Sequence, residues 1–296
     1  MRVLVTGKEG QLVRSLIERA KVKTDIEIIA LGRPELDLEV AGSAAEAVRK
    51  LRPDAVLNAA AYTAVDQAED QPERAFRVNA EAAGELAAAA RASGAPIIQI
   101  STDYVFDGTA DGAYEEQAAT NPLGVYGRSK LEGERQVSWH NPDHVIVRTA
   151  WVYSPFGRNF LKTMMTLAQS RDVLTVVSDQ LGNPSSALDL ADGLVALLSR
   201  WGAGERTGLG EIYHLGGTGA ATWFEFTRLI CSELQRLGLP AAEVRPIRTE
   251  DWPTKAPRPK NSVLDSSKFA RDMAFAMPEW RSSAQAIIRR LTGTPA

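Results

Sequence analysis

Cysteine is almost absent from this 296-residue sequence, in which Cys231 stands alone. One cysteine cannot form an internal disulfide and fits a reducing compartment, which predicts a cytoplasmic protein. The histidines are also few, namely His140, His144 and His214, and they have no cysteine partners at the spacing of zinc ligands. We therefore expect no zinc site.

An excess of basic residues and long apolar runs are lacking too. Lysine and arginine number 34 against 37 acidic residues, for a net charge of −3, so no nucleic-acid partner is expected. No stretch approaches the roughly 18 apolar residues of a membrane span, and the first apolar run is too short for a signal peptide. The composition, 44% hydrophobic and 24% charged, is that of an ordinary globular protein.

Short apolar runs alternate with helical patterns through the first 150 residues. The runs are rich in Val, Ile and Leu without strict alternation, which is typical of strands buried on both faces of a parallel sheet. The predicted strands are Arg2–Thr6, Glu27–Leu31, Ala55–Asn58, Ile97–Ser101 and Val145–Arg148. Predicted helices between them include Gln11–Ala20, Ala44–Leu51 and Arg77–Ser93. This order predicts an α/β fold with a doubly wound parallel sheet of the Rossmann type.

The alternation of predicted strands and helices becomes less regular after about residue 150. Helices are expected at Phe160–Gln169, Leu188–Trp201 and Trp223–Leu237, with stretches containing proline and glycine between and after them, such as Pro246–Pro259. A chain of this length is comfortable for one large domain with a smaller lobe. We expect residues 1–150 to form the first domain and residues 151–296 mainly a smaller C-terminal lobe, with some later segments returning to the first domain.

A glycine-rich turn, Gly7-Lys8-Glu9-Gly10, follows the first predicted strand and precedes a helix. Gly7 permits a sharp turn. Gly10 lets the backbone approach a pyrophosphate at the helix N-terminus, where free N–H groups and the helix dipole favour anions. Gly-x-x-Gly is a weak signal alone, but its place between strand and helix predicts a dinucleotide site. Val13 replaces the third glycine of the usual fingerprint, which changes the expected packing distance and not the phosphate site.

The segment after the second predicted strand bears on the choice of nicotinamide cofactor. NAD sites often place an acid there to bind the ribose 2′-hydroxyl, whereas this segment reads Ala30-Leu31-Gly32-Arg33-Pro34. Arg33 can bind a 2′-phosphate bidentately, which favours NADPH and leaves NADH use open; the alternative is a merely exposed arginine. Asp37 and Leu38 are expected to border the adenine pocket.

Tyr126 and Lys130 have Tyr-x-x-x-Lys spacing, which on a helix places both side chains on one face. A free phenol has a pKa of about 10 and is a poor proton donor at neutral pH. We expect the ammonium, together with the charge of an oxidised nicotinamide, to lower the pKa of Tyr126 and make it a general acid. An exposed helical pair is the alternative interpretation.

The segment 101–108, Ser-Thr-Asp-Tyr-Val-Phe-Asp-Gly, begins at the end of a predicted strand, where open α/β sheets bind ligands. The hydroxyl of Thr102 can hydrogen-bond a substrate carbonyl there. Thr102, Tyr126 and Lys130 together predict a site that reduces a carbonyl group.

These motifs resemble those of the extended short-chain dehydrogenase/reductases and, more narrowly, of the dTDP-4-dehydrorhamnose reductase family. The resemblance extends through nearly the whole chain. It rests on the glycine turn and on residues 58–69, 101–108, 122–134, 148–153, 179–184 and 258–262. It implies reduction of the 4-keto group of dTDP-4-dehydro-L-rhamnose to dTDP-L-rhamnose, with the cofactor in the first domain and the nucleotide sugar mainly in the C-terminal lobe.

Roles can be assigned position by position from the motifs and the resemblance. The catalytic set is Thr102, Tyr126 and Lys130. The expected cofactor contacts are Gly7, Gly10, Gln11, Leu12, Arg33, Asp37, Leu38, Ala59, Ala60, Ala61, Ser101, Tyr126 and Lys130. The expected substrate contacts are Thr63, Val65, Asp103, Tyr104, Trp151, Gln180, Asn183 and Arg258. Alternative interpretations are a core residue for Trp151 and a surface arginine for Arg258.

The resemblance departs from its pattern at two positions. Relatives with a magnesium-bridged dimer use glutamates on the first helix and in the later lobe, where this sequence has Ser15 and Leu188. Neither side chain supplies the carboxylate oxygens that magnesium prefers. We therefore expect no essential metal, and either a monomer or a homodimer that no metal bridges.

Two other functions stay open at this point. Another nucleotide-sugar epimerase, dehydratase or reductase of the same superfamily is the first, although a dehydratase would be expected to carry a further acid where Tyr104 follows Asp103. The second is a non-catalytic partner like the regulatory β subunit of methionine adenosyltransferase, against which the intact Thr102, Tyr126 and Lys130 set argues.

Overall fold

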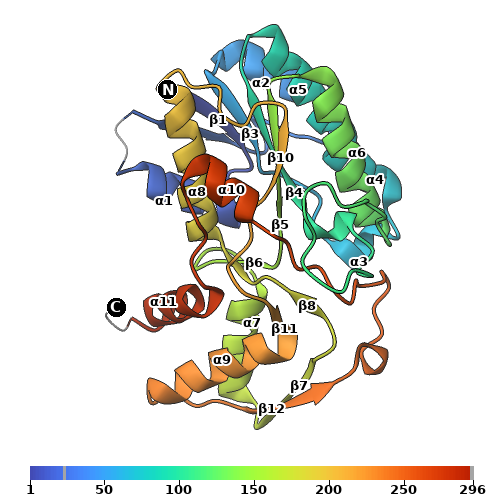
Figure 1. Cartoon of the computed structure of the whole chain (residues 1–296), viewed down its shortest axis with the longest axis vertical. Helices are drawn as coiled ribbons and strands as arrows, with labels where there is room; N and C mark the ends of the chain where they lie inside the picture. Colours follow the sequence, from blue (N-terminus) through green and yellow to red (C-terminus); the bar gives the residue numbers. More distant parts are fainter. Residues whose placement is uncertain (23–24, 294–296) are drawn as a thin grey trace.

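The computed structural model describes residues 1–22 and 25–293, and within them a six-stranded parallel sheet forms the centre (Figure 1). The strand order is β10-β5-β4-β3-β1-β2. The strands are β1 (Arg2–Thr6), β2 (Glu27–Leu31), β3 (Ala55–Asn58), β4 (Ile97–Thr102), β5 (His144–Thr149) and β10 (Glu211–His214). The first five agree with the predicted strands to within one residue at each end, which confirms the doubly wound α/β fold; β10 was not predicted.

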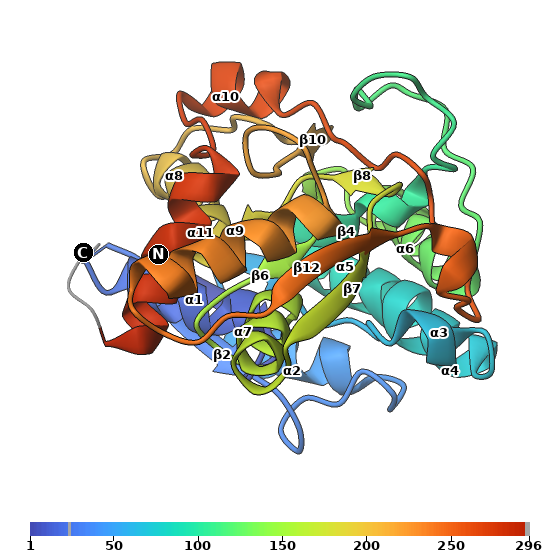
Figure 2. The same cartoon turned by 90° about the horizontal axis from the view of Figure 1, so that it is seen from below.

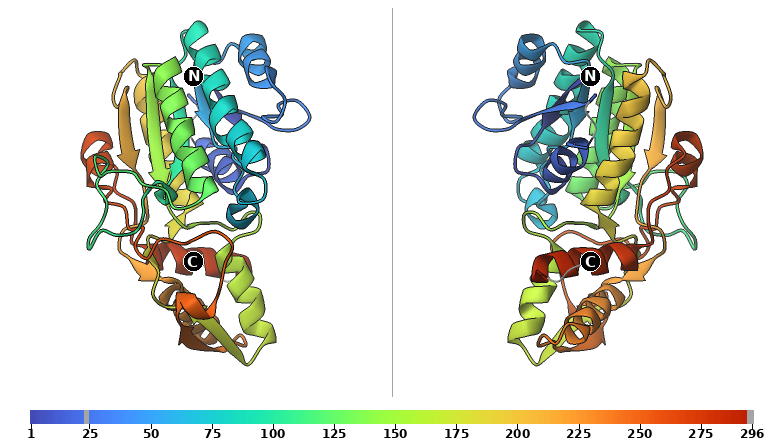
Figure 3. Two further views of the ribbon diagram at one scale, coloured as in Figure 1. Left: turned by 90° about the vertical axis from the view of Figure 1, so that its right-hand side faces the viewer. Right: turned by 90° about the vertical axis from the view of Figure 1, so that its left-hand side faces the viewer.

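Helices cover both faces of the sheet (Figure 3). On one face lie α1 (Gln11–Ala20), α8 (Ala187–Gly202) and α10 (Ser267–Met273). On the other lie α2 (Ser43–Leu51), α5 (Ala82–Ala92) and α6 (Val125–His140). Strand β1 shows why both faces are apolar, because Val3 and Val5 enter the first core and Leu4 enters the second. Successive side chains of a strand point to opposite faces.

The predicted helix Arg77–Ser93 is longer and less regular in the structure. It continues from α4 (Pro72–Phe76) through a π-helical turn at Arg77–Glu81 into α5. Inside that turn the side chain of Asn79 accepts the N–H of Tyr62 and donates to the hydroxyl of Ser129 on α6. Such π-turns are frequent at functional sites, and this one connects the segment after β3, which includes α3 (Val65–Ala68), to the helix that carries Tyr126.

The remaining elements form a lobe below the sheet (Figures 1 and 2). Its core is shared by α7 (Phe160–Ser170), α9 (Trp223–Arg236), α11 (Trp280–Thr292) and the parallel pair β7 (Val173–Val177) and β12 (Glu243–Ile247). Two small ladders join β6 (Val152–Tyr153) to β9 (Ser185–Ser186) and β8 (Leu181–Gly182) to β11 (Ala221–Thr222). Cys231 is buried in this core. In the described ranges, no helix has the length and hydropathy needed to cross a bilayer.

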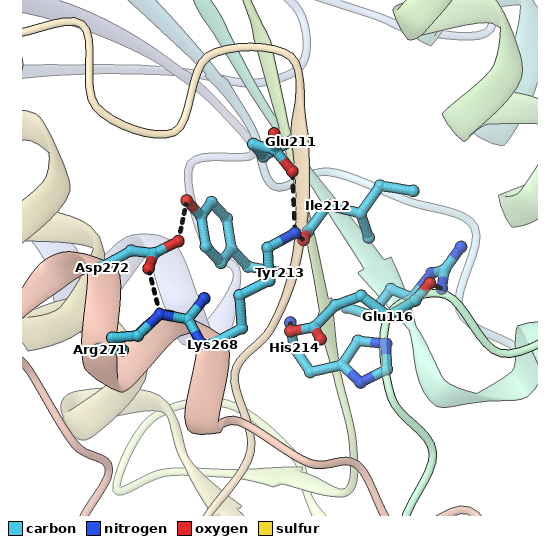
Figure 4. Close-up of polar contacts among 9 residues, drawn as sticks. Glu116, Glu211, Ile212, Tyr213, His214, Lys268, Arg271 and Asp272 are labelled. Atoms are coloured by element: carbon cyan, nitrogen blue, oxygen red, sulfur yellow. Dashed lines mark hydrogen bonds and ion pairs between the residues drawn. The ribbon is translucent and has the colours of Figure 1, made fainter.

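Strand β10 is the last strand of the sheet, and side chains from two other segments bind its outer backbone groups (Figure 4). The ammonium of Lys268 on α10 donates to the carbonyl of Ile212 at 2.8 Å and to the carboxylate of Glu211 at 2.9 Å. The carboxylate of Glu116 accepts the N–H of His214 at 2.9 Å. These contacts attach α10 and the loop around Glu116 to the sheet.

Candidate active site

The turn after β1 and the segment after β3 meet where the strand order reverses, which is where doubly wound sheets bind ligands. Gly7 adopts a left-handed conformation with φ of 92°, and a Cβ atom there would lie 3.4 Å from the Cβ of Ala60. The hydroxyl of Thr6 accepts the N–H groups of Ala59 and Ala60 at 3.1 and 3.0 Å. These hydrogen bonds fix the segment after β3 beside the turn that leads into helix α1.

A cleft of about 680 Å³ lies over this turn. It is bordered by six of the predicted cofactor contacts, namely Gly7, Arg33, Asp37, Leu38, Ala60 and Ala61, and by Thr63, which was predicted to touch the substrate. Gly10 precedes helix α1 as its N-cap, with an extended backbone and no side-chain cap, so the first N–H groups of the helix are available to an anion. The residues present fit a dinucleotide.

Two other predicted cofactor contacts are used inside the protein. The side-chain oxygen of Gln11 accepts hydrogen bonds from Ser154 at 3.0 Å and Asn159 at 2.9 Å, which connects α1 to the loop after β6. The side chain of Leu12 packs against the core. The side-chain oxygen of Gln11 and the side chain of Leu12 are thus committed to the fold, whereas their backbone N–H groups lie in the first turn of α1.

Tyr126 lies in the first turn of α6, which contacts the segment after α3 and the segment after β4. The carboxylate of Glu69 accepts the N–H of Val125 at 2.7 Å and caps the helix from outside. Gly127 is required because a Cβ atom there would lie 2.2 Å from the carbonyl oxygen of Tyr104. Helix and strand end are thus close enough for Tyr126 to interact with Thr102, the last residue of β4.

The pKa of Tyr126 differs from our expectation. Burial raises it to about 12, and hydrogen bonding with Thr102 offsets only part of that effect. We expected the ammonium of Lys130 to lower it, but the Lys130 Nζ atom donates to the carbonyl of Ile100 at 2.6 Å, and burial dominates. Without a cofactor the phenol is therefore protonated, which is the form that can give a proton to a carbonyl oxygen.

Three charged side chains lie buried behind Tyr126, and we call Lys130, Glu134 and Arg148 the catalytic floor. Arg148 binds both carboxylate oxygens of Glu134, at 2.9 and 2.7 Å, and the Ser101 hydroxyl donates to the same carboxylate at 2.5 Å. Burial lowers the pKa of Lys130 to about 8, against the opposing influence of Glu134 one turn away on α6. Ser101, predicted as a cofactor contact, thus supports the floor.

Asp103 and Tyr104 follow Thr102 in the chain, and burial raises the pKa of both side chains. The Thr102 hydroxyl donates to the carboxylate of Asp103 at 2.9 Å, and burial raises the pKa of Asp103 to about 6. Burial also raises the pKa of Tyr104 above its usual range. The ring of Tyr104 meets the ring of Tyr126 edge to face at 5.8 Å, and Val65 lies beside both in a small cavity. Asp103 is therefore placed to orient the Thr102 hydroxyl.

A second pocket, of about 640 Å³, opens between the lobe and the segments that carry Asp66 and Tyr104. Aromatic and aliphatic side chains form most of its wall, and Tyr104, Gln180 and Arg258 are also part of it. The guanidinium of Arg258 donates to the carboxylate of Asp66 at 2.7 Å and lies 6.0 Å from the ring of Tyr104. Arg258 is thus a partly buried residue facing a pocket, and not a free surface arginine.

Comparison with known proteins supplies the family. Residues 1–292 match the family of the RmlD substrate binding domain. The chain belongs to that family. A dTDP-4-dehydrorhamnose reductase of Sinorhizobium fredii is 42% identical to it over 97% of each chain. The crystal structure of a dTDP-4-dehydrorhamnose reductase of Clostridium acetobutylicum is 37% identical and has a TM-score of 0.90, covering 99% of this chain and 100% of the other.

A second solved structure is that of the dTDP-4-dehydrorhamnose reductase of Bacillus anthracis in complex with NADP. It has a TM-score of 0.89 and 34% identity, and the match covers 98% of this chain and 99% of that one. The resemblance inferred from the motifs is therefore confirmed as family membership.

Among the residues of this RmlD family chain, Trp151 has an unusual backbone. Its φ of 45° is left-handed, a conformation that costs a residue with a side chain roughly 1–2 kcal/mol. Its ring stacks on that of Trp223 with centroids 3.4 Å apart and planes within 4°, and the indole N–H of Trp223 donates to Gln180 at 3.2 Å. Strain of this kind is frequent at binding sites, so the predicted substrate contact of Trp151 stays a prediction that its backbone favours.

The side chain of Asn183 is used inside the protein. Its side chain is 3% exposed. Its amide donates to the carbonyls of Gly217 and Gly219 and accepts the N–H of Leu264, which holds three chain segments together. These internal hydrogen bonds make Asn183 a supporting residue of the fold, and its contact with substrate stays a prediction.

Sequence reasoning missed several charged residues around the site. Glu134 follows Lys130 by four residues and could have been found from helical spacing. Asp66 and Glu69 lie in a segment recognised only as a motif. Arg74 and Glu39 border the cofactor cleft, but they come from separate segments, and no local pattern connects them.

Proposed function

We propose that the chain is an oxidoreductase that uses NADPH to reduce the 4-keto group of dTDP-4-dehydro-L-rhamnose, giving dTDP-L-rhamnose. The observation that carries this proposal is the hydrogen bond between Tyr126 and Thr102, with Lys130 one turn further along α6. Tyr126 shares a small cavity with Tyr104, which also borders the second pocket. Relatives that match over nearly their whole length carry the name of this activity.

The reaction delivers a hydride to the carbonyl carbon and a proton to its oxygen. The nicotinamide supplies the hydride when bound. Tyr126 gives its proton to the ketone oxygen, and Thr102 turns its hydroxyl from Asp103 to the same oxygen, where negative charge develops. Lys130 holds the nicotinamide ribose through its ammonium and stabilises the phenolate left on Tyr126. The turn at Gly7 and Gly10 holds the pyrophosphate of the cofactor.

The nucleotide portion of the substrate occupies the second pocket. The apolar wall, with Phe160, Met164 and Trp223, suits a base. Arg258 suits the pyrophosphate, because its fork binds phosphate oxygens bidentately. The sugar lies against Tyr104, Val65 and Trp151, with Gln180 at the pocket wall. Binding energy from the nucleotide positions the distant keto group, so the free keto-sugar should be a much poorer substrate.

The proposed cofactor is NADPH, the reduced form of the NADP bound in the Bacillus anthracis relative, with NADH as an alternative. Magnesium does not bridge a dimer in this proposal. Ser15 is buried with its hydroxyl on the carbonyl of Gln11 at 2.9 Å, and Leu188 lies in the lobe core. Within residues 1–22 and 25–293, no group of three acids, histidines or cysteines is arranged to hold a metal ion.

Steady-state kinetics test the proposal directly. The substrate dTDP-4-dehydro-L-rhamnose is generated in situ, NADPH oxidation is followed by absorbance, and the product is identified. A panel of other nucleotide 4-keto sugars and the free keto-sugar run alongside, with Tyr126→Phe as the blank. We expect turnover with the dTDP sugar. Turnover only with a different nucleotide sugar would reject the named substrate, and a lack of oxidation with every sugar would reject the activity.

A further inference from the structure

Two arginines at the cofactor cleft approach the same carboxylate oxygen of Glu39. The Oε1 atom of Glu39 lies 2.6 Å from Nη2 of Arg74 and 3.8 Å from Nη1 of Arg33. All three residues border the cleft. Arg33 follows β2, Glu39 lies on the loop before α2, and Arg74 is on α4. We call this set the phosphate rim.

Arg74 is the better anchored of the two arginines. Its guanidinium lies 5.6 Å from the centre of the Tyr62 ring and donates to the side-chain oxygen of Gln71 at 3.3 Å. Arg33 has a side chain that is 70% exposed, and it reaches Glu39 at the longer distance of 3.8 Å. Arg74 is therefore held in place by its neighbours, whereas Arg33 is exposed and only loosely paired with Glu39.

The neighbouring acid, Asp37, does not complete this set. Its carboxylate accepts the N–H of Glu39 at 3.0 Å, and its own N–H donates to the hydroxyl of Ser43 at 2.9 Å. These hydrogen bonds shape the loop and present Glu39 to the arginines. The rim therefore has two guanidiniums and one carboxylate, an arrangement in which a phosphate could replace the carboxylate with more charge and more acceptor oxygens.

We infer that Glu39 sets the choice between NADPH and NADH, and that Arg33 and Arg74 are the two arms of a 2′-phosphate site that Glu39 fills when that phosphate is absent. The inference rests on the proposed use of a nicotinamide cofactor. With NADH, the Glu39 carboxylate accepts the ribose 2′-hydroxyl, as acids do in NAD sites. With NADPH, Glu39 must withdraw, because its charge repels the phosphate that the arginines attract.

The test measures binding of two fragments by isothermal titration calorimetry, without any sugar substrate. The first fragment, 2′,5′-ADP, carries the phosphate in question, and 5′-AMP lacks it. Glu39→Gln should tighten 2′,5′-ADP roughly tenfold, because a like charge is removed at close range, and should leave 5′-AMP unchanged or weaker. Arg74→Met should weaken 2′,5′-ADP roughly tenfold and leave 5′-AMP within about twofold.

The matched control is Glu35→Gln, which makes the same charge change on the same loop at an exposed residue that does not line the cleft. It should leave the binding of both fragments unchanged. The inference is overturned if Glu39→Gln or Arg74→Met shifts both fragments equally, or if Glu35→Gln acts as Glu39→Gln does. Failure of every variant and the wild type to bind either fragment would reject the cofactor assignment itself. Discrimination between fragments without sugar reduction would reject only the proposed reaction.

Discussion

The catalytic floor and the phosphate rim use the same chemistry in two environments. In the floor, Arg148 and Glu134 have side chains that are 3% and 5% exposed. In the rim, Arg33 and Glu39 are 70% and 37% exposed. A buried ion pair that loses one partner leaves an uncompensated charge in a medium of low dielectric. An exposed pair loses little, because water replaces the partner.

This difference separates permanent from exchangeable contacts. The floor holds β4, β5 and α6 together and fixes the surroundings of Lys130, so its ion pair is part of the fold. If the inferred 2′-phosphate site is correct, the rim exchanges its carboxylate for a ligand oxygen at small cost. The comparison then assigns buried charge to the support of the reacting groups and exposed charge to the capture of a ligand.

The largest expected effect is the loss of kcat when Tyr126, the proposed proton donor, is replaced. Tyr126→Phe removes the proton donor and leaves the charges of floor and rim intact. General acid catalysis is worth about 10²–10⁴-fold, so kcat should fall by that factor while 2′,5′-ADP binding is unchanged. Stopped-flow or steady-state kinetics with calorimetry check this. Near-wild-type turnover would remove Tyr126 from the mechanism.

Breaking the floor itself should cost stability. Arg148→Met leaves the Glu134 carboxylate buried without its partner, which should lower the free energy of unfolding by about 3–5 kcal/mol. The matched control is Arg245→Met, because Arg245 also binds both oxygens of a carboxylate, that of Glu243, but with side chains 58% and 59% exposed.

The control should change the free energy of unfolding by less than about 1 kcal/mol. Denaturant unfolding followed by circular dichroism compares the two variants. Equal losses would mean that burial does not separate the two kinds of ion pair.

The pH dependence sharpens the role of Lys130, whose pKa burial lowers to about 8. Above that pH the ammonium loses its charge, so kcat/KM, which reports the free enzyme, should fall about tenfold per pH unit. Tyr126, with a pKa of about 12, does not titrate in this range. A Lys130→Arg variant stays charged and should lack the limb near pH 8; a limb that persists there belongs to another group.

Loss of folding does not explain that alkaline limb. The folded chain releases the Lys130 proton at lower pH than the unfolded chain, whose lysine pKa is about 10.4. Between these values the unfolded state binds more protons, so this group makes folding more favourable as the pH rises. Thermal unfolding measured across the same pH range distinguishes lost activity from lost structure.

Arg258 is intermediate between floor and rim, with its side chain 16% exposed and that of its partner Asp66 47% exposed. Arg258→Met should raise KM for the nucleotide sugar roughly tenfold through the lost charge-assisted hydrogen bonds. Asp66→Asn, which frees the guanidinium, should leave KM unchanged or lower. Equal increases in KM for both variants would show that the ion pair matters only as structure.

The smallest expected effect is that of a chelator. Because Ser15 and Leu188 offer no carboxylate, sedimentation runs with and without EDTA should give the same oligomeric state. A dimer that dissociates in EDTA and re-forms with magnesium would contradict this prediction.

The strands and the main helices of the first half could be predicted because their signals are local. Buried parallel strands are continuous apolar runs, and helices have a regular apolar period. Strand β10 was missed because Glu-Ile-Tyr-His is short and partly polar, and it becomes a strand only by pairing with β5. The π-turn before α5 likewise depends on Asn79 reaching Tyr62 and α6.

Within the candidate site, some features also follow from local spacing in the sequence and others depend on the whole fold. The positions of Tyr126 and Lys130 follow from helical spacing, but the pKa of Tyr126 does not, because it depends on how deeply the whole fold buries the hydroxyl. The pair of Arg258 and Asp66 spans 192 positions. Glu39 was missed because we looked for an acid only at the end of β2, whereas the loop that follows brings one into the cleft.

Strand β10 has a consequence for how molecules of this protein meet one another. The border of a sheet offers unpaired N–H and C=O groups on which a strand from another chain can add, and this is a route to aggregation. Here Lys268 occupies the outward carbonyl of Ile212, and Glu116 occupies the N–H of His214. An incoming strand would have to displace an ammonium and a carboxylate before it could pair. The polar side chains that attach α10 and the loop around Glu116 thereby also discourage growth of the sheet from one molecule into the next.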